Sequence, residues 1–297
     1  MAITIDPSEL AKDFRLDIRN RLSQLDRRLK LVGFLSTSET PSRTYASYTK
    51  AGCDDVGIDF ELIEVPKLEL EAAIDQANSD PDVHGIIVYY PIFNTDHDRY
   101  IKDLVDHRKD IEGLHTYWAK KLYHNERFVD EAKTKKALLP CTPLAVVKLL
   151  AKARATLGCE VDTMRPLAGA KVSIFNRSEV VGRPLAAMLA NDGAEVYSFD
   201  LDGALKFVGG TVEESKITRT SALAASDIVV TGVPSRNFQL VAPSEIKAGA
   251  ICLNFSTLRN FTSDIGDKAS VFIPRVGPMT VAMALRNTLR LYENYHA

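Results

Sequence analysis

The chain has 297 residues, 45% of them hydrophobic and 26% charged, and carries a formal net charge of −2 from 37 basic and 39 acidic residues. This length has room for two domains, and the balanced charge argues against a nucleic-acid-binding surface or a polybasic membrane contact. The four cysteines form no C-x-x-C pair, which argues against a disulfide framework or a zinc site. The polar first segment and the lack of a long apolar stretch lead us to expect a cytoplasmic protein.

The first third of the chain alternates predicted helices and strands. Asp6, Pro7 and Ser8 form a helix-start signal, and apolar residues at helical spacing continue from it to Leu25. Short apolar runs then predict buried strands, the last of them continuously apolar, as expected when both faces of a sheet are covered. The predicted strands cover residues 29–36, 60–66 and 83–93, and the helices between them cover 42–57 and 68–80.

A second alternation follows a long predicted helix within residues 138–158, which we expect to connect two domains. Strands alternating with helices imply a parallel sheet with right-handed crossovers. The predicted strands here cover residues 169–176, 194–200, 227–234 and 248–255, with a helix over 178–193 after the first of them.

The expected fold class is α/β, with two α/β domains and a cleft between them. Residues 1–147 are expected to form the first domain, and residues 148–277 a Rossmann-type dinucleotide-binding domain. The amphipathic helix within residues 278–297 is expected to pack back onto the first domain.

The turn from Asn176 to Gly182 lies between a predicted strand and a predicted helix, where helix N-terminal amides stabilise a pyrophosphate. It lacks the G-x-G-x-x-G pattern, so an ordinary strand–helix turn is the alternative. Ser178 can donate to a phosphate, and Gly182 permits a close approach of helix and sheet. We expect four residues of this turn to contact the cofactor, namely Arg177, Ser178, Val181 and Gly182.

Asp200 ends the next predicted strand, about 20 residues later, where an acidic side chain hydrogen-bonds the ribose hydroxyls of NAD. Because a 2′-phosphate would meet a like charge there, Asp200, with its neighbour Leu201, favours NAD over NADP. Arg177 opposes this interpretation, because a guanidinium near the ribose could bind a phosphate. A solvated aspartate at a strand end is the alternative.

The turn from Thr231 to Pro234 follows another predicted strand and should lie at the same edge of the sheet. Gly232 would let its backbone approach the nicotinamide or its ribose, with Val233 and Pro234 beside it. A plain β-turn is the alternative.

Six segments, in chain order, resemble the motifs of the methylenetetrahydrofolate dehydrogenase/cyclohydrolase family: SRTYASYTKAGCDDVGI, GIIVYYP, KDIEGLH, LLPCTPLAVVKLL, NRSEVVGRPLAAMLANDGAEV and VGPMTVAMALRNTL. The resemblance covers nearly the whole chain and is strongest to the fungal monofunctional, NAD-dependent members. It implies an N-terminal folate domain, a Rossmann domain, a tetrahydrofolate substrate, NAD as cofactor, a homodimer, and a place in one-carbon metabolism and purine biosynthesis.

The departures from the family pattern concern the implied catalytic positions. The motif S-x-x-Y-x-x-x-K of bifunctional members keeps Tyr45, but its lysine position is Thr49. The neighbouring Lys50 lies about 100° around the helix and should point elsewhere. The glutamine that supports the family's lysine is replaced by Tyr89, and the aspartate that binds the pterin is Glu112, which keeps the carboxylate.

These departures have a chemical interpretation. Removal of hydride from the methylene carbon leaves a methenyl cation shared by N5 and N10, and this step needs close approach to nicotinamide but no proton transfer by the enzyme. Cyclohydrolase chemistry needs a group that handles protons, such as the missing lysine. The sequence therefore predicts a dehydrogenase that releases 5,10-methenyltetrahydrofolate.

The resemblance also implies roles for residues with ordinary alternatives. Tyr45 would stack on the folate, although a helical tyrosine is more often a packing residue. Cys141 would lie beside the folate or nicotinamide, although a lone cysteine is usually a small buried hydrophobe. In the shortened C-terminal motif Thr280 should line the nicotinamide side, whereas Arg275 is foreign to the family pattern. No cluster of metal ligands is apparent.

Three alternatives remain open from the sequence. Lys50 could replace the missing lysine in a bifunctional dehydrogenase/cyclohydrolase. The altered positions could mark a non-catalytic paralogue that binds NAD as a regulator. The chain could also be another two-domain NAD dehydrogenase, acting on a small acid and ignoring folates.

Overall fold

The computed structural model describes residues 1–297, which divide into two compact units. Unit 1 comprises Met1–Leu10, Leu122–Asn125 and Thr142–Met279, and unit 2 comprises Ala11–Lys121, Glu126–Cys141 and Thr280–Ala297. The first ten residues belong to unit 1 because β1 (Ile3–Thr4) pairs with β11 (Val271–Ile273). These units are defined by compactness. Our assignment of folate binding to residues 1–147 and cofactor binding to residues 148–277 stays a prediction.

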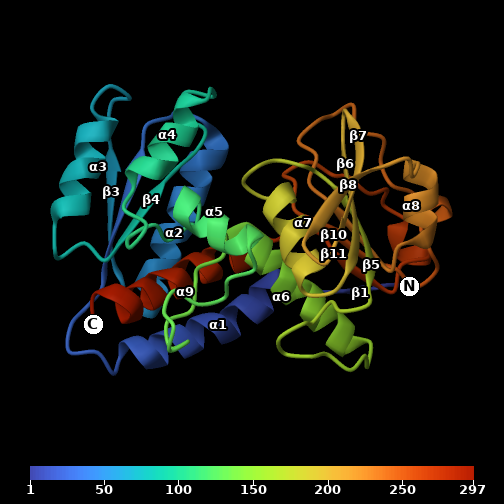
Figure 1. Cartoon of the computed structure of the whole chain (residues 1–297), viewed down its shortest axis with the longest axis horizontal. Helices are drawn as coiled ribbons and strands as arrows, with labels where there is room; N and C mark the ends of the chain where they lie inside the picture. The colour runs from blue at the N-terminus through green and yellow to red at the C-terminus, as the bar shows by residue number, and fades with distance from the viewer. The chain divides into compact units, whose positions relative to one another are not determined.

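Unit 2 contains a parallel three-stranded sheet in the order β3-β2-β4 (Figure 1). Its strands are β2 (Lys30–Leu35), β3 (Asp59–Glu64) and β4 (Gly85–Val88). Its helices are α2 (Thr40–Val56), α3 (Leu70–Ser79), α4 (His97–Leu104), most of α5 (Thr116–Tyr123), and the larger parts of α1 (Pro7–Leu22) and α9 (Gly277–Tyr295).

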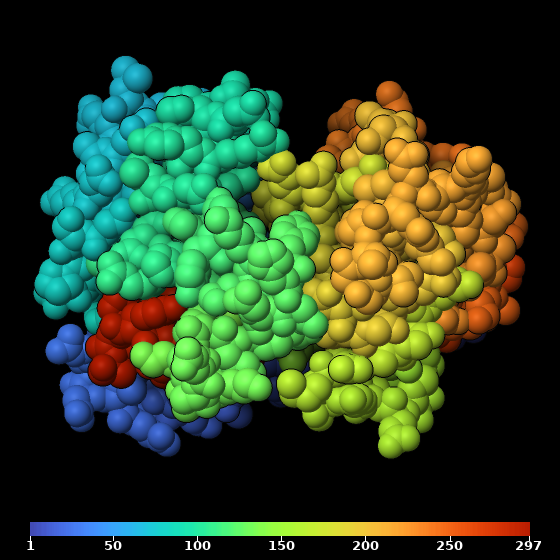
Figure 2. Space-filling model, in the orientation of Figure 1, coloured from blue at the N-terminus to red at the C-terminus, as the bar shows by residue number.

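The two faces of this sheet have different cover. Val32 and Phe34 of β2 belong to a core cluster with residues of α3 and α4, such as Ile74 and Ile101. On the other face, a Cβ at Gly85 would lie 3.3 Å from a side-chain carbon of Thr288 in α9. The alternation follows from the two-residue repeat of a strand. On the face drawn in Figure 2, the last turns of α9 reach the surface beside α1.

Unit 1 contains an eight-stranded sheet in the order β1-β11-β10-β9-β5-β6-β7-β8. The six strands from β1 to β6 in this order are parallel. Its remaining strands are β5 (Lys171–Phe175), β6 (Glu195–Asp200), β7 (Gly203–Val208), β8 (Thr211–Ser215), β9 (Ile228–Thr231) and β10 (Ile251–Asn254). Its helices are α6 (Cys141–Thr156), α7 (Gly182–Asn191) and α8 (Arg219–Ala225), with short 3-10 turns η1 (Pro243–Glu245) and η2 (Ile265–Asp267).

The order of the strands places a topological switch point at β5, because β6 and β9 lie on opposite sides of it. In open α/β sheets, ligands bind outside the carboxyl ends of the strands at such a point. The two turns expected to bind a cofactor follow β5 and β9 directly, so both lie at this edge.

The α/β fold class is confirmed, but the sheet of unit 1 is not parallel throughout. The polar stretch after Asp200, for which we predicted no strand, forms the antiparallel strands β7 and β8. Every residue of β8 except Ser215 is exposed, so this edge strand has little of the apolar alternation from which strands are predicted. None of the helices combines the length and apolar character that a bilayer span requires.

Candidate functional site

Tyr45, Thr49 and Tyr89 come together in unit 2. Tyr45 and Thr49 lie one turn apart on α2, and Tyr89 follows β4. The rings of Tyr45 and Tyr89 meet edge to face, with centroids 5.6 Å apart. Thr49 is fully buried and donates its hydroxyl to the backbone oxygen of Tyr45 at 2.9 Å. The position of the family's lysine is therefore filled by a short side chain whose hydroxyl makes a hydrogen bond within its own helix.

A glycine makes room for the ring of Tyr89. A Cβ at Gly33 of β2 would lie 2.8 Å from the ring of Phe60 and 3.2 Å from that of Tyr89. The first distance is shorter than real Cβ contacts allow, so a side chain at position 33 would displace these rings.

Lys50 points away from this cluster. Its ammonium group binds both carboxylate oxygens of Asp54, at 2.9 and 3.1 Å, on the exposed side of α2. The expectation from helix geometry is confirmed, and the bifunctional alternative loses its candidate lysine.

Glu112 follows a tight turn built on Asp110. The carboxylate of Asp110 accepts the backbone N–H groups of Glu112, Gly113 and His115, at 2.8 to 3.0 Å. The carboxylate of Glu112 makes no hydrogen bond or ion pair, and burial together with the charge of Asp110 raises its pKa to about 8. Because the Asp110 carboxylate is occupied by the turn, Glu112 is the carboxylate left for a ligand.

Cys141 lies against the same turn as a buried thiol. It donates to the backbone oxygen of Ile111 at 3.2 Å, and the side-chain nitrogen of Asn287 lies 3.5 Å from its sulfur. Burial raises the pKa of Cys141 well above its usual value, so the thiol stays neutral. These contacts fit a packing residue near the site and give no sign of a nucleophile.

Several buried polar atoms around these residues have no partner. They are the hydroxyls of Tyr45 and Tyr89 and the side-chain oxygen of Asn287, which is fully buried on α9. Leaving a buried polar group unsatisfied costs about 1–3 kcal/mol, so such a cluster is typical of a ligand site. Asn287 was not predicted, because an asparagine within an amphipathic helix carries no sequence signal.

The loop that follows Tyr89 and Tyr90 is also held by a residue that we did not predict. Asp98, in the first turn of α4, accepts the backbone N–H groups of Ile92, Phe93 and Asn94 at 2.9 to 3.2 Å. Ser42 donates to the backbone oxygen of Tyr90 from α2. The loop beside the tyrosine cluster is thus fixed at both ends.

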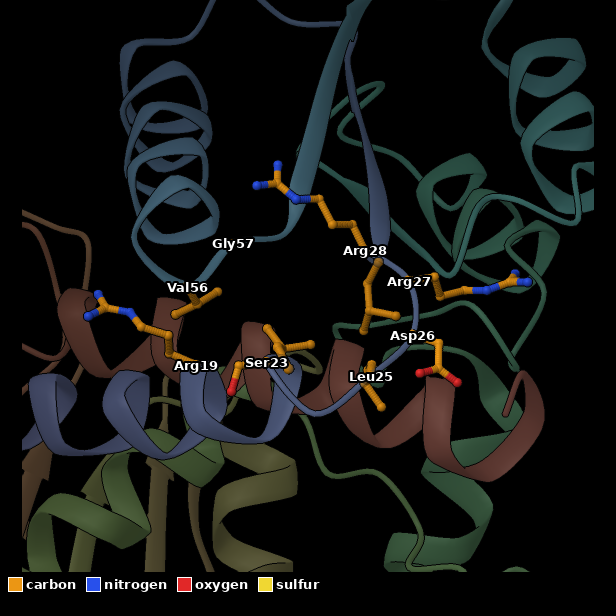
Figure 3. Close-up of a pocket in the computed structure, with 10 residues that line it drawn as sticks. Arg19, Ser23, Leu25, Asp26, Arg27, Arg28, Val56 and Gly57 are labelled. Carbon is orange, nitrogen blue, oxygen red and sulfur yellow. The ribbon is translucent and has the colours of Figure 1, made fainter.

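A separate hollow of about 360 Å³ lies elsewhere in unit 2, at the end of α1. Figure 3 shows that the guanidinium groups of Arg19, Arg27 and Arg28 along it point in different directions. Arg19 and Arg28 are paired with Asp55 and Asp59. None of the predicted site residues lines this hollow, and its charges do not converge, so we assign it no function.

In unit 1, Gly182 brings the start of α7 against the end of β5. A Cβ there would lie 2.1 Å from the backbone oxygen of Asn176, which no side chain could tolerate. The Ser178 hydroxyl donates to the Asn176 side-chain oxygen at 2.8 Å and lies 3.3 and 3.4 Å from the amides of Val181 and Gly182. The predicted donation from Ser178 to a phosphate remains a prediction, because the hydroxyl proton is used within the turn.

Arg177 lies at the same end of the sheet, but its guanidinium is turned into the β6–β7 hairpin, and its contact with a cofactor stays a prediction. Its side chain is only 5% exposed and donates to the backbone oxygens of Ser198 and Gly203 and to the carboxylate of Asp202. Asp200, in contrast, ends β6 with an exposed carboxylate that accepts the amide of Leu201 at 2.8 Å. Leu201 itself is fully exposed.

The second turn is joined to the first by Asn176, which donates to the backbone oxygen of Gly232 at 2.8 Å. The space where a Gly232 Cβ would lie is taken by the ring of Phe255, 1.9 Å away. The backbone N–H and oxygen of Val233 are both bound by Asn260, and Pro234 is exposed. Gly232 is thus required by packing within the turn, and its approach to a nicotinamide stays a prediction.

The C-terminal motif divides between the two units. Thr280 is buried in α9 as part of unit 2. Arg275 lies in unit 1, is exposed, and pairs with Asp6 at 3.2 Å. This foreign residue therefore ties the loop to the start of α1, and no group of metal-binding side chains is present in either unit.

Comparison with known proteins places these features in a family. The profile described as "Tetrahydrofolate dehydrogenase/cyclohydrolase, catalytic domain" matches residues 5–112, and that described as "NAD(P)-binding domain" of the same family matches residues 140–296. The chain belongs to the tetrahydrofolate dehydrogenase/cyclohydrolase family. The resemblance inferred from six motifs is confirmed.

Relatives within this family match nearly the full chain. Methylenetetrahydrofolate dehydrogenase [NAD(+)] of Dictyostelium discoideum is 42% identical, covering 98% of this chain and 94% of its own length. The protein of the same name from Schizosaccharomyces pombe is 40% identical, with 96% and 91% covered. The structure of the NAD-dependent 5,10-methylenetetrahydrofolate dehydrogenase from Saccharomyces cerevisiae matches with a TM-score of 0.91 and 39% identity, covering 99% of this chain and 98% of that one.

Proposed function

We propose that this chain is an NAD-dependent methylenetetrahydrofolate dehydrogenase that releases 5,10-methenyltetrahydrofolate and lacks cyclohydrolase activity. The relatives at about 40% identity are named as that dehydrogenase, and this chain matches them over nearly their full length. The lack of cyclohydrolase activity is inferred from Thr49. This buried residue occupies the lysine position, and its hydroxyl donates a hydrogen bond to the backbone oxygen of Tyr45.

The residues of unit 2 bind and orient the folate in this proposal. Glu112 would accept the pterin amino group and ring N–H, because its carboxylate is the one left without a partner. Tyr45 and Tyr89 would line the folate, and Cys141 would pack beside it as a neutral thiol. With no ammonium group in this cluster, nothing opposes the positive charge that N5 and N10 share once the hydride has left.

NAD supplies the hydride acceptor when it is bound. The residues of unit 1 fit this cofactor. The dinucleotide would lie at the carboxyl ends of the strands beside the switch point at β5, and Gly182 permits the start of α7 to approach the end of β5 closely. Asp200 would present its exposed carboxylate to the ribose hydroxyls. The same carboxylate disfavours a 2′-phosphate. We therefore assign folate binding to the first domain and NAD binding to the second.

Loss of cyclohydrolase activity follows from what the cluster cannot do. Attack of water on the methenyl carbon needs a group that takes and returns protons while a C–N bond breaks. Thr49 donates its hydrogen bond within α2, Cys141 and both tyrosines are buried with raised pKa values, and Lys50 is bound to Asp54. Glu112 has a pKa of about 8, but in this proposal its carboxyl group is engaged by the pterin ring and is not available to the methenyl carbon.

Steady-state oxidation of methylenetetrahydrofolate with NAD and NADP side by side tests the proposal. We expect NADH formation with a clear preference for NAD, and Asp200→Ser should reduce that preference. NAD binding without any NADH formation would instead favour a non-catalytic paralogue, and an unchanged cofactor ratio in Asp200→Ser would contradict our assignment of that residue.

We also propose a homodimer that forms through the free edge of the sheet in unit 1. The outer strand β8 has no neighbour on one side, and Val212 within it is 54% exposed. Light scattering should give twice the chain mass, and Val212→Lys should lower it; a monomeric wild-type chain would refute this.

The four free cysteines are in keeping with a reducing compartment, and we propose the cytoplasm.

A further inference from the structure

Arg177 is a buried cation of unit 1, packed against strands β6 and β7. Its guanidinium donates to the backbone oxygen of Ser198 at 2.9 Å and to that of Gly203, which lie on β6 and β7. The Nε atom of Arg177 is buried and has no partner. The side chain is therefore anchored by the β6–β7 hairpin, directly beneath the end of β6 that carries Asp200.

Asp202 is the one anionic partner of this cation. Its carboxylate lies 2.6 Å from Nη1 of Arg177, and the Asp202 side chain is 79% exposed, whereas that of Arg177 is 5% exposed. The two backbone oxygens fix the position of the guanidinium but carry no net charge. Asp202 thus supplies the compensating charge without being needed to fill the core.

The location gives this pair a consequence for ligand choice. Asp200, Asp202 and Arg177 all lie at the carboxyl end of β6, where the adenosine ribose of a dinucleotide is expected. A neutralised arginine offers little attraction to a phosphate. The same arginine without its partner would be a fixed positive charge close to the ribose 2′ position, in a partly buried setting where charges are weakly screened.

We propose that Asp202 is a second determinant of NAD selectivity, acting by neutralising Arg177, while Asp200 acts by repelling a 2′-phosphate directly. The inference rests on the proposed function only for its use of NAD. It explains how the chain retains an arginine in the cofactor turn and still favours a cofactor without the 2′-phosphate. It also predicts that Asp200→Ser reduces the preference for NAD mainly by weakening NAD binding, while NADP binding stays weak because Arg177 stays paired.

The test is a calorimetric titration of the full-length chain with 5′-AMP and with adenosine 2′,5′-bisphosphate (2′,5′-ADP), which differ only in the 2′-phosphate. The variants are Asp202→Asn, which keeps an acceptor for Arg177 but removes the charge, and Asp202→Ala, which removes both. Asp264→Asn serves as the matched control, because Asp264 is an exposed aspartate of the same unit near η2.

We expect Asp202→Asn to raise the affinity for 2′,5′-ADP relative to 5′-AMP by about fivefold, or about 1 kcal/mol, with no change in the control. Combination with Asp200→Ser should increase the ratio further. An unchanged ratio in both Asp202 variants, an equal loss of both nucleotides, or an equal shift in Asp264→Asn would overturn the inference. The titration contains no folate, so a failure of the proposed dehydrogenase activity would leave its result standing.

Discussion

The surroundings of Glu112 decide whether it is charged near neutral pH. Its pKa is raised from 4.5 to about 8, so between these values the folded chain keeps a proton that the unfolded chain has lost. The stabilising effect of that proton is complete below about pH 4.5 and disappears as the pH rises through about 8. Above about pH 8, the ionised Glu112 therefore destabilises the folded protein when no ligand donates hydrogen bonds to it.

Replacement of Glu112 by glutamine should reveal this cost. Relative to wild type, Glu112→Gln should gain stability as the pH rises from about 5 to about 8, by at most about 1.4 kcal/mol per pH unit. Denaturant unfolding at several pH values measures the difference, with Glu131→Gln as an exposed control. Parallel pH profiles for Glu112→Gln and wild type would show that the carboxyl group is not perturbed.

Single residues also show where prediction from sequence ends. Thr49, Tyr89 and Glu112 were predicted from motif positions, and the direction of Lys50 from helix geometry alone. The inward direction of Arg177 could not be predicted, because it depends on the unpredicted hairpin that provides its acceptors. Asn287 acts through contacts distant in sequence, which a single sequence does not reveal. Asp98 acts on residues only four to six positions away, but the loop conformation that brings their amides to its carboxylate has no sequence signal.

Among the elements, α7 depends on Gly182 for its position against β5. A Cβ at this position would strike the Asn176 backbone oxygen, and backbone cannot move aside as a flexible side chain can. Gly182→Ala should destabilise the chain by about 1–3 kcal/mol or more and weaken NAD binding at least tenfold. Gly266→Ala is the control, since a Cβ there meets only Ala2 at 3.6 Å. Equal NAD affinity in both variants would contradict this role.

The start of α4 fixes the loop after the tyrosine cluster through Asp98. Asp98→Ala removes the acceptor of three backbone N–H groups, so amide hydrogen exchange at Ile92, Phe93 and Asn94 should become faster. Asp96→Ala should leave these amides unchanged, because exposed Asp96 pairs only with Arg99. Unaltered exchange in Asp98→Ala would mean that other contacts hold the loop.

The elements were predictable where their residues are buried in a regular pattern. The central strands β5, β9 and β10 are buried along their length, with the apolar runs from which they were predicted. Strand β8 is polar and exposed, β7 buries only Ala204 and Phe207, and β1 and β11 have only two and three residues. Those short or polar strands are defined by their pairing partners, which a local pattern cannot supply.

For the whole molecule, the proposed function divides the work between two units, with folate binding in unit 2 and NAD binding in unit 1. The proposed reaction is a hydride transfer, which needs no proton-handling group from the chain. The cluster of Tyr45, Thr49, Tyr89 and Cys141 has no ammonium group, which is why we propose this step without a following cyclohydrolase step.

The most direct test follows the products of a single reaction, with methylenetetrahydrofolate and NAD as substrates. Absorbance records NADH and methenyltetrahydrofolate together, and a parallel sample without enzyme gives the uncatalysed hydrolysis of methenyltetrahydrofolate. We predict one methenyltetrahydrofolate for each NADH, with subsequent hydrolysis no faster than in the enzyme-free sample. Hydrolysis to 10-formyltetrahydrofolate that accelerates in proportion to enzyme concentration would show instead that the chain is also a cyclohydrolase.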